Sequence, residues 1–248
     1  MDSGLYAACA ALMARTDSLD TLANNLANVS TAGFRGREAS FSSVLAASAH
    51  HPLSSVLNQA TNSYGVIGAI STDSSEGTLT KTGNTMDFAV QGPGYFSVQT
   101  SNGTAYTRNG AFQVSARGQL MTQGGDAVLG ENGAIQLLPG AKLSVGEDGT
   151  LSSGGAIIGR LKLVEFPAGT DLTNAGGSLY TAPQGSAKTA ISSSVQQGML
   201  EGSNVNPVAA VVTLIEAQRS AETMRHALSI VDGQMDKVAA EDLPRISS

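Results

Sequence analysis

The stretch LYAACAALMARTDSLDTLANNL, residues 5–26, decides the fold class of this chain. It contains no glycine or proline, and its apolar or small residues recur at alternating steps of four and three. The positions on this stripe are Leu5, Cys9, Leu12, Thr16, Leu19, Ala23 and Leu26. Such a seven-residue repeat is typical of an α-helix that packs along one face. The spacing therefore predicts an N-terminal helix whose stripe needs a partner.

The other end of the chain shows the same pattern over a longer range. Asn206-Pro207 is a typical helix start, because asparagine caps well and proline suits the first helical position. The stripe then runs through Ala210, Leu214, Ala217, Ala221, Met224, Leu228, Val231, Met235 and Val238. Isolated helices of this length are marginal in water. Two interpretations remain open at this point: the helices pair with each other or with another chain, or they pack onto a globular core.

The middle of the chain indicates short strands. Beyond residue 77 brief apolar runs alternate with dipeptides that suit tight hairpin turns. These dipeptides are Asn102-Gly103, Asn109-Gly110, Asn132-Gly133 and Asp148-Gly149. The sequence thus predicts an α+β fold in which N- and C-terminal helices pair as a coiled coil around a central all-β domain. The expected ranges are 1–35 with 200–248 for the helical domain, 36–76 for an extended connector and 77–199 for the β domain.

The composition argues against several classes of function. Among the 248 residues, charged side chains make up 14%, the net charge is −6 and basic residues form no cluster, so we expect no nucleic-acid partner. No apolar run approaches the roughly 18 residues that span a bilayer, so we expect no membrane insertion. The single cysteine leaves no intramolecular disulfide. These features leave a structural or interaction role open.

The sequence contains no arrangement of side chains that would support catalysis, a metal or a cofactor. The three histidines lack metal-ligand spacing; they are His50, His51 and His226. Cys9 lies on the predicted helix stripe and is interpreted as a small apolar residue. Asp87 is the one carboxylate within an apolar run, and it either caps a turn or is buried against a partner such as Arg108. We therefore expect no catalytic residue, no metal and no cofactor.

Three blocks of sequence carry a resemblance. The first is NNLANVSTAGFR, residues 24–35. The second is GNTMDFAVQGPGYF, residues 83–96, followed by YTRNGAF at 106–112. The third is QGMLEGSNVN, residues 197–206, followed by QRSAE at 218–222. Together they resemble the signatures of the bacterial flagellar basal-body rod and hook axial proteins. Ser220-Ala221 and Asn109 depart from the usual pattern, and the chain is more similar to the proximal-rod type than to the distal-rod type.

The resemblance implies a structural subunit that polymerises into a helical tube, transmits motor torque and surrounds the export channel. The implied partners are copies of itself, neighbouring rod proteins and the flagellar export apparatus. The implied location is the periplasmic rod, reached without a cleaved signal peptide. The expected assembly interface comprises Leu5, Leu12, Leu19, Leu26, Asn24, Asn25, Asn28, Gly33, Phe34, Asn204, Leu214, Gln218, Arg219, Glu222, Leu228 and Val231.

Two other classes of protein remain as alternatives. One is a secreted β-domain that binds carbohydrate or another ligand, with the helices serving as oligomerisation tails. Tyr95, Phe96 and Tyr106 would then form an aromatic platform. The other is a hydrolase, which has less support because no catalytic constellation is present.

Overall fold

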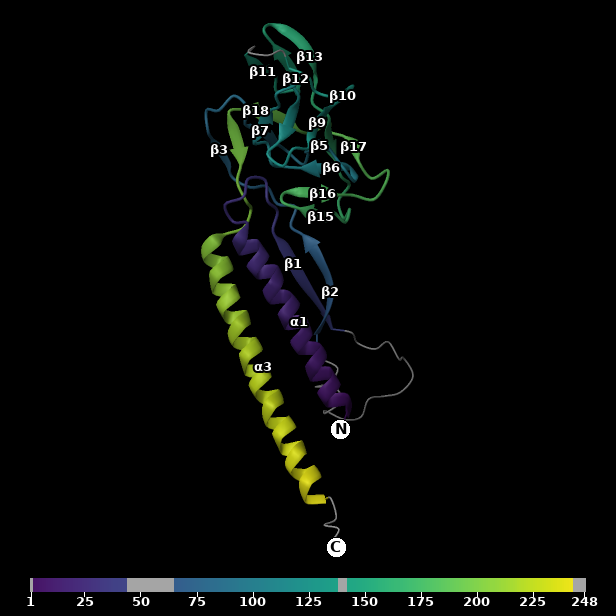
Figure 1. Ribbon diagram of the computed structural model, residues 1–248, viewed down its shortest axis with the longest axis vertical. Coiled ribbons are helices and arrows are strands. Elements are labelled where there is room, and N and C mark those ends of the chain that lie inside the picture. Colours follow the sequence, from purple (N-terminus) through teal and green to yellow (C-terminus); the bar gives the residue numbers. More distant parts are fainter. Residues whose placement is uncertain (1, 44–64, 138–141, 243–248) are drawn as a thin grey trace. The chain divides into compact units, whose positions relative to one another are not determined.

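The computed structural model describes residues 2–43, 65–137 and 142–242. In the order of the sequence, two helices, α1 (Asp2–Ala27) and α3 (Pro207–Asp242), stand before and after a β-rich middle (Figure 1). This confirms the predicted α+β class. His50 and His51, which were expected not to bind a metal, lie within residues 44–64, outside the described part of the chain.

The chain forms two compact units. The helical unit comprises the described parts of 1–26, 37–70 and 207–248, and the β unit comprises those of 27–36 and 71–206. The boundaries of these units differ from the predicted domain ranges. Residues 27–35, expected with the helices, belong to the β unit, and within the expected connector the chain forms β1 (Arg37–Ser43) and β2 (Gly65–Thr72), which pair with each other.

Helices α1 and α3 belong to the same unit and run in opposite directions (Figure 1). On α3 the predicted stripe is the sheltered one. Ala210 and Ala221 are buried and the positions between and after them are half-buried, namely Leu214, Ala217, Met224 and Leu228. Seven-residue spacing therefore identified the sheltered line of α3.

On α1 the buried line is offset by two residues from the predicted stripe, which places it about 160° around the helix. Cys9, Thr16 and Ala23 are exposed, which corrects the interpretation of Cys9 as a packed apolar residue. The buried residues are Ala11, Ala14, Thr21 and Asn25, while Leu12, Leu19 and Leu26 on the predicted stripe are half-buried. These leucines lie on another side of α1, so more than one side of the helix is covered.

The β unit is built around one large antiparallel sheet. Its strand order is β15-β16-β6-β5-β9-β8-β7, with β10 added on β9, and with β14 bonded to both β5 and β17. A three-stranded sheet β11-β12-β13 and the pairs β18-β4 and β19-β3 complete it. The strands are β3 Leu79–Lys81, β4 Phe88–Gln91, β5 Tyr95–Thr100, β6 Gly103–Thr107, β7 Phe112–Val114, β8 Leu120–Thr122, β9 Ala127–Gly130, β10 Gly133–Ala134, β11 Leu143–Val145, β12 Thr150–Ser153, β13 Ala156–Arg160, β14 Leu163–Glu165, β15 Thr173–Gly176, β16 Leu179–Thr181, β17 Lys188–Thr189, β18 Ser194–Gln197 and β19 Met199–Glu201.

Three of the four predicted turn dipeptides join paired strands. Asn102-Gly103 links β5 to β6, Asn132-Gly133 links β9 to β10, and Asp148-Gly149 links β11 to β12. Asn109-Gly110 is different, because it follows β6 without joining it to an adjacent paired strand. A side chain on Gly110 would overlap the carbonyl of Phe88, so close backbone approach accounts for glycine there.

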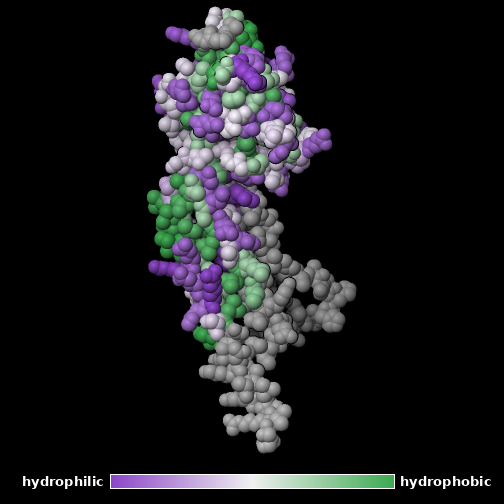
Figure 2. Space-filling view, viewed as in Figure 1, coloured by the Kyte–Doolittle hydropathy of each residue, from purple (hydrophilic) through white to green (hydrophobic). Residues whose placement is uncertain are grey.

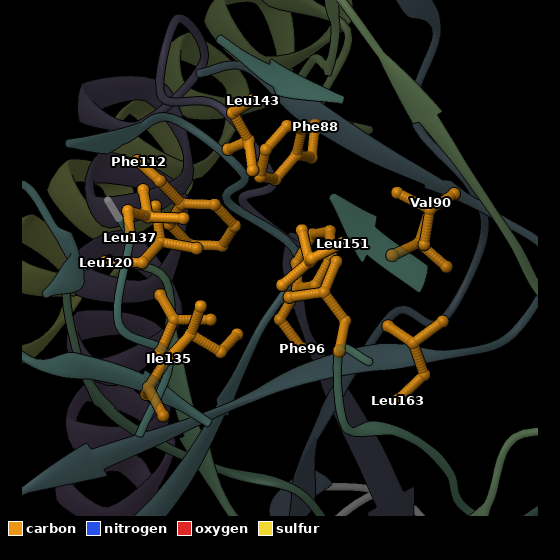
Figure 3. Packing of buried hydrophobic residues seen from close by; sticks show 14 of the residues in the cluster. Phe88, Val90, Phe96, Phe112, Leu120, Ile135, Leu137, Leu143, Leu151 and Leu163 are labelled. Carbon is orange, nitrogen blue, oxygen red and sulfur yellow. The ribbon is translucent and has the colours of Figure 1, made fainter. Parts of the chain in front are cut away.

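The core of the β unit is aromatic and aliphatic (Figure 3). Phe96 and Leu151 are fully buried, and the rings of Phe96 and Phe112 meet edge to face with centroids 5.1 Å apart. A second cluster joins Tyr95 to Tyr180. Since Tyr95 and Phe96 are buried, they cannot form the exposed aromatic platform that the ligand-binding alternative requires.

The last strands of the β unit come from far along the chain. Strand β18 pairs with β4 through Val195 and Val90, and β19 pairs with β3 through Leu200 and Thr80. The β unit therefore incorporates the chain immediately before α3 as well as residues 27–36, which follow α1. These two segments are hydrogen-bonded to each other within the β unit.

Candidate functional site

The described parts of the chain hold no group of three or more histidine, cysteine or acidic side chains that could bind a metal. None of the described helices is both long and apolar enough to span a membrane.

Asp87 accepts hydrogen bonds from Thr82 Oγ1 at 2.7 Å and from Asn84 Nδ2 at 3.0 Å. It therefore caps a turn, as one of the two predicted alternatives stated, and Arg108 has a different partner.

The segments that follow α1 and precede α3 are bonded to each other, and this junction is the best-defined site in the β unit. The amide of Gly33 donates to the carbonyl of Glu201 at 2.8 Å, and the amide of Asn204 donates to that of Phe34 at 3.3 Å. The side-chain oxygen of Asn204 accepts from Gly36 N at 2.7 Å. Its nitrogen donates to Asp73 Oδ2 at 3.0 Å. Asn204 thus ties three separate segments together.

The same junction contains a buried cluster of charged side chains. Glu201 Oε1 is 2.8 Å from Arg35 Nη2, and Glu201 Oε2 is 3.1 Å from Arg108 Nη1. All three side chains are 1% exposed. Oε1 also accepts the amide of Gly77 at 2.8 Å. One carboxylate therefore faces two guanidinium groups away from water.

The two arginines are held differently. Arg108 donates to the carbonyl oxygens of Val90 and Gly92, and its guanidinium lies 5.0 Å from the centre of the Tyr95 ring. Burial lowers the pKa of Arg108, Glu201 opposes this shift and Arg35 adds to it. The Arg35 side chain makes the charge contact with Glu201, but no hydrogen bond of good geometry to the described residues. Arg35 therefore depends on Glu201 more than Arg108 does.

The structure brings three of the predicted interface residues to the junction, namely Gly33, Phe34 and Asn204. Gly33 has φ +65° and lies against the backbone of Arg108 and Asn109, where a side chain has no room. Phe34 is 1% exposed. In the helical unit, the side-chain amide of Asn25 donates to Arg37 O at 2.8 Å and accepts from Arg37 N at 2.9 Å. Gly33, Phe34, Asn25 and Asn204 therefore satisfy contacts within the chain itself.

The other predicted interface residues divide between sheltered and outward positions. Leu12, Leu19, Leu26, Leu214 and Leu228 are half-buried, as is Asn28. Asn24, Gln218, Arg219 and Glu222 are exposed. Side-chain burial of Leu5 and Val231 is outside the described part of the structure. Whether these residues form an assembly interface stays a prediction.

The first turns of α3 carry an outward apolar face that sequence reasoning did not single out. Val211, Val212 and Ile215 are 41%, 51% and 45% exposed. At about 100° per residue they lie roughly 130° around the helix from the buried line of Ala210 and Ala221. Figure 2 shows apolar surface along this part of α3. Valines at steps of three and four indicate this second face in the sequence, but the heptad spacing predicted only the other face.

The buried hydroxyl of Tyr180 gives the junction a measurable pH response. It accepts the Arg35 amide at 3.0 Å, and burial raises its pKa from 10 to about 12. An unfolded tyrosine ionises near pH 10, so the folded state loses stability as pH rises from 10 to 12, by about 1.4 kcal/mol per pH unit. Tyr180→Phe lacks this term, so we expect a flatter stability curve over that window. Urea unfolding at several pH values measures both curves, and parallel curves would contradict the assignment.

Comparison with known proteins identifies the family. Residues 5–35 match the family described as flagella basal body rod protein, residues 89–153 match the flagellar hook protein FlgE/F/G D1 domain, and residues 196–240 match the flagellar basal body rod FlgEFG protein C-terminal family. The rod protein FlgF of Caulobacter vibrioides is 32% identical over the full length of both chains. The chain belongs to the flagellar basal-body rod protein family.

Other relatives agree with this assignment. FlgF of Escherichia coli is 33% identical, with 94% of this chain and 95% of that protein covered. FlgG of Buchnera aphidicola subsp. Schizaphis graminum is 30% identical, with 96% and 99% covered. The predicted membership of the rod family, with a FlgF-like sequence, is confirmed. This rod protein is accordingly a structural protein of the flagellar basal body.

The three matched regions each contribute one member of the charged cluster in this rod protein. Arg35 is the last residue of the first match, Arg108 lies in the second and Glu201 in the third. None of the three was among the residues predicted for the interface. Each lies within a quoted block, but nothing in the spacing of residues 35, 108 and 201 indicates that they touch.

Proposed function

We propose that this rod protein works by polymerising and without catalysis. Helices α1 and α3 of one subunit pair as a coiled coil along their sheltered lines, and the outward face of α3 contacts neighbouring rod subunits. The family resemblance supports a periplasmic helical tube that surrounds the export channel and carries torque, reached through the flagellar export apparatus without a cleaved signal peptide.

The observation that supports this proposal is the presence of two apolar faces on α3. One face is sheltered within the helical unit at Ala210 and Ala221, and the other exposes Val211, Val212 and Ile215. A helix that only covered its own subunit would need one apolar face, with polar residues opposite. The second face therefore favours contact with another subunit.

The size of the outward face suits a repeated contact better than an isolated dimer. Fully burying one valine or isoleucine contributes about 1.5–3 kcal/mol, and these side chains are already about half covered. Three such residues are a small part of the roughly 800 Å² per partner that a stable pairwise interface buries. Weak contacts of this kind become stable when each subunit in an array has several neighbours. The monomer should accordingly persist in solution until it is incorporated into the rod.

A charge on the outward face tests the proposal. We expect Val212→Asp to abolish motility in a strain that lacks its own copy, because the carboxylate would enter an apolar contact without a partner. Thr213→Asp is the matched control, since Thr213 is exposed and lies on the helix about 100° from Val212. The thermal unfolding transition of the β unit, measured on the purified full chain, should be the same in both variants. Full motility of the Val212→Asp strain would contradict the proposed use of this face.

A further inference from the structure

We propose that Glu201 is a latch that closes the β unit. Its single carboxylate joins Arg35, from the segment that follows α1, to Arg108, from the end of the β6 region, and itself belongs to the last strand before α3. The β unit and both boundary segments then form and open as one cooperative body. This inference concerns the folding of the subunit and does not rest on the proposed use of α3.

The buried cluster holds two positive side chains and one negative side chain. Two guanidinium groups and one carboxylate are each 1% exposed, and only Glu201 forms an ion pair with either arginine among the described residues. Like charges in a poorly solvated interior repel strongly, and a buried charge without a partner is costly. Without Glu201 the two arginines would be left facing each other. The closed β unit therefore requires the carboxylate to be in place.

The order of the chain turns this requirement into a constraint on folding. Arg108 and Glu201 are 93 residues apart, and Glu201 enters the unit with β19, after every other strand. Strand β4 likewise cannot complete its pairing until β18 has folded, because Val90 pairs with Val195. Core strands that close around Arg108 before β19 arrives would bury its charge unpaired. The β unit should thus remain incomplete until the chain beyond residue 200 has joined it.

Hydrogen exchange on the full chain tests whether the unit is one cooperative body. The junction amides of Gly33 and Asn204 should exchange as slowly as amides of the core strands β5 and β9, because all of them would open only on global unfolding. In pulse labelling during refolding, junction and core should gain protection in the same phase. If β5 and β9 become protected in an earlier phase, or if the junction exchanges much faster than the core, the proposal is wrong.

Charge variants of the full chain supply a second, independent test. Glu201→Gln keeps the shape but leaves two buried arginines, so the unfolding equilibrium constant should rise on the order of 100- to 1000-fold. Arg35→Met leaves the balanced pair of Glu201 and Arg108 and should cost less. Adding Arg35→Met to Glu201→Gln should make the double variant more stable than Glu201→Gln alone. Glu131→Gln is the control, because Glu131 pairs with Arg160 at the surface.

The outcomes separate the latch from an ordinary structural contact. Rescue of Glu201→Gln by Arg35→Met supports the latch, including the case in which Glu201→Gln alone does not fold and the double variant does. Additive losses in the double variant, or a double variant that does not fold, overturn it. A Glu201→Gln protein as stable as the Glu131→Gln control also overturns it.

Discussion

Gly33→Ala is expected to destabilise the β unit by about 3 kcal/mol or more. Gly33 has φ +65°, a conformation that costs an L-residue roughly 1–2 kcal/mol. A Cβ at this position would also overlap the backbone of Arg108 and Asn109. Backbone atoms cannot rotate aside as a flexible side chain can, so the two chain segments must separate. The Gly33–Glu201 backbone bond and the ion pair of Arg35 would be strained together.

Gly83→Ala is the matched control for this prediction. Gly83 has φ +75°, but nothing lies within 4 Å of where its Cβ would be. Its cost should therefore be limited to the backbone term, on the order of 1 kcal/mol. Urea unfolding of the two purified variants measures the difference. Equal losses of stability would mean that the close approach at Gly33 contributes nothing beyond its backbone conformation.

Ala221→Asp is expected to abolish assembly and motility while leaving the β unit intact. Ala221 is 4% exposed on the sheltered line of α3. A carboxylate there would have to be buried without a partner, which costs several kcal/mol, or the helix would have to move away from what covers it. Because Ala221 belongs to the helical unit, the thermal transition of the β unit should not change. A motility assay beside calorimetry of the purified variant measures both.

Ser220→Asp places the same charge one residue away and serves as the control. Ser220 is exposed, so its carboxylate stays in water and should leave motility near the wild-type level. Loss of the β-unit transition in Ala221→Asp would show that the helix stabilises the β unit after all. Normal motility of Ala221→Asp would show that the sheltered line of α3 is not needed for assembly.

Local patterns in the sequence predicted much of the fold. The heptad steps on α3 predicted the sheltered positions from Ala210 to Leu228, because an unbroken period of 3.5 to 3.6 residues leaves little doubt about which residues share a face. Asn102-Gly103 and Asp148-Gly149 predicted hairpin turns because few other residues adopt positive φ without strain. The extended blocks that resemble the rod family predicted the family itself.

The local pattern alone did not predict which side of α1 is buried. Two lines on nearly opposite sides of that helix, about 160° apart, have the same seven-residue spacing, one through Leu12 and Leu19 and one through Ala14 and Thr21. Hydrophobicity favours the leucine line, yet the structure buries the line of small residues. The segments that pack against α1 decide between the lines; Asn25 on the buried line, for example, is bonded to Arg37 of β1. This packing is a property of the folded unit and not of the helix alone.

The sequence by itself determined the terminal helices, the β-rich middle, several of its turns and the family of the chain, since each of these depends on residues close together along the chain. The tertiary structure alone decided that Arg35, Arg108 and Glu201 meet in a buried cluster and that Asn204 joins Gly36 to Asp73. The physical reason is that a charged residue is buried only where a distant segment supplies its counter-charge, and no local period records that encounter.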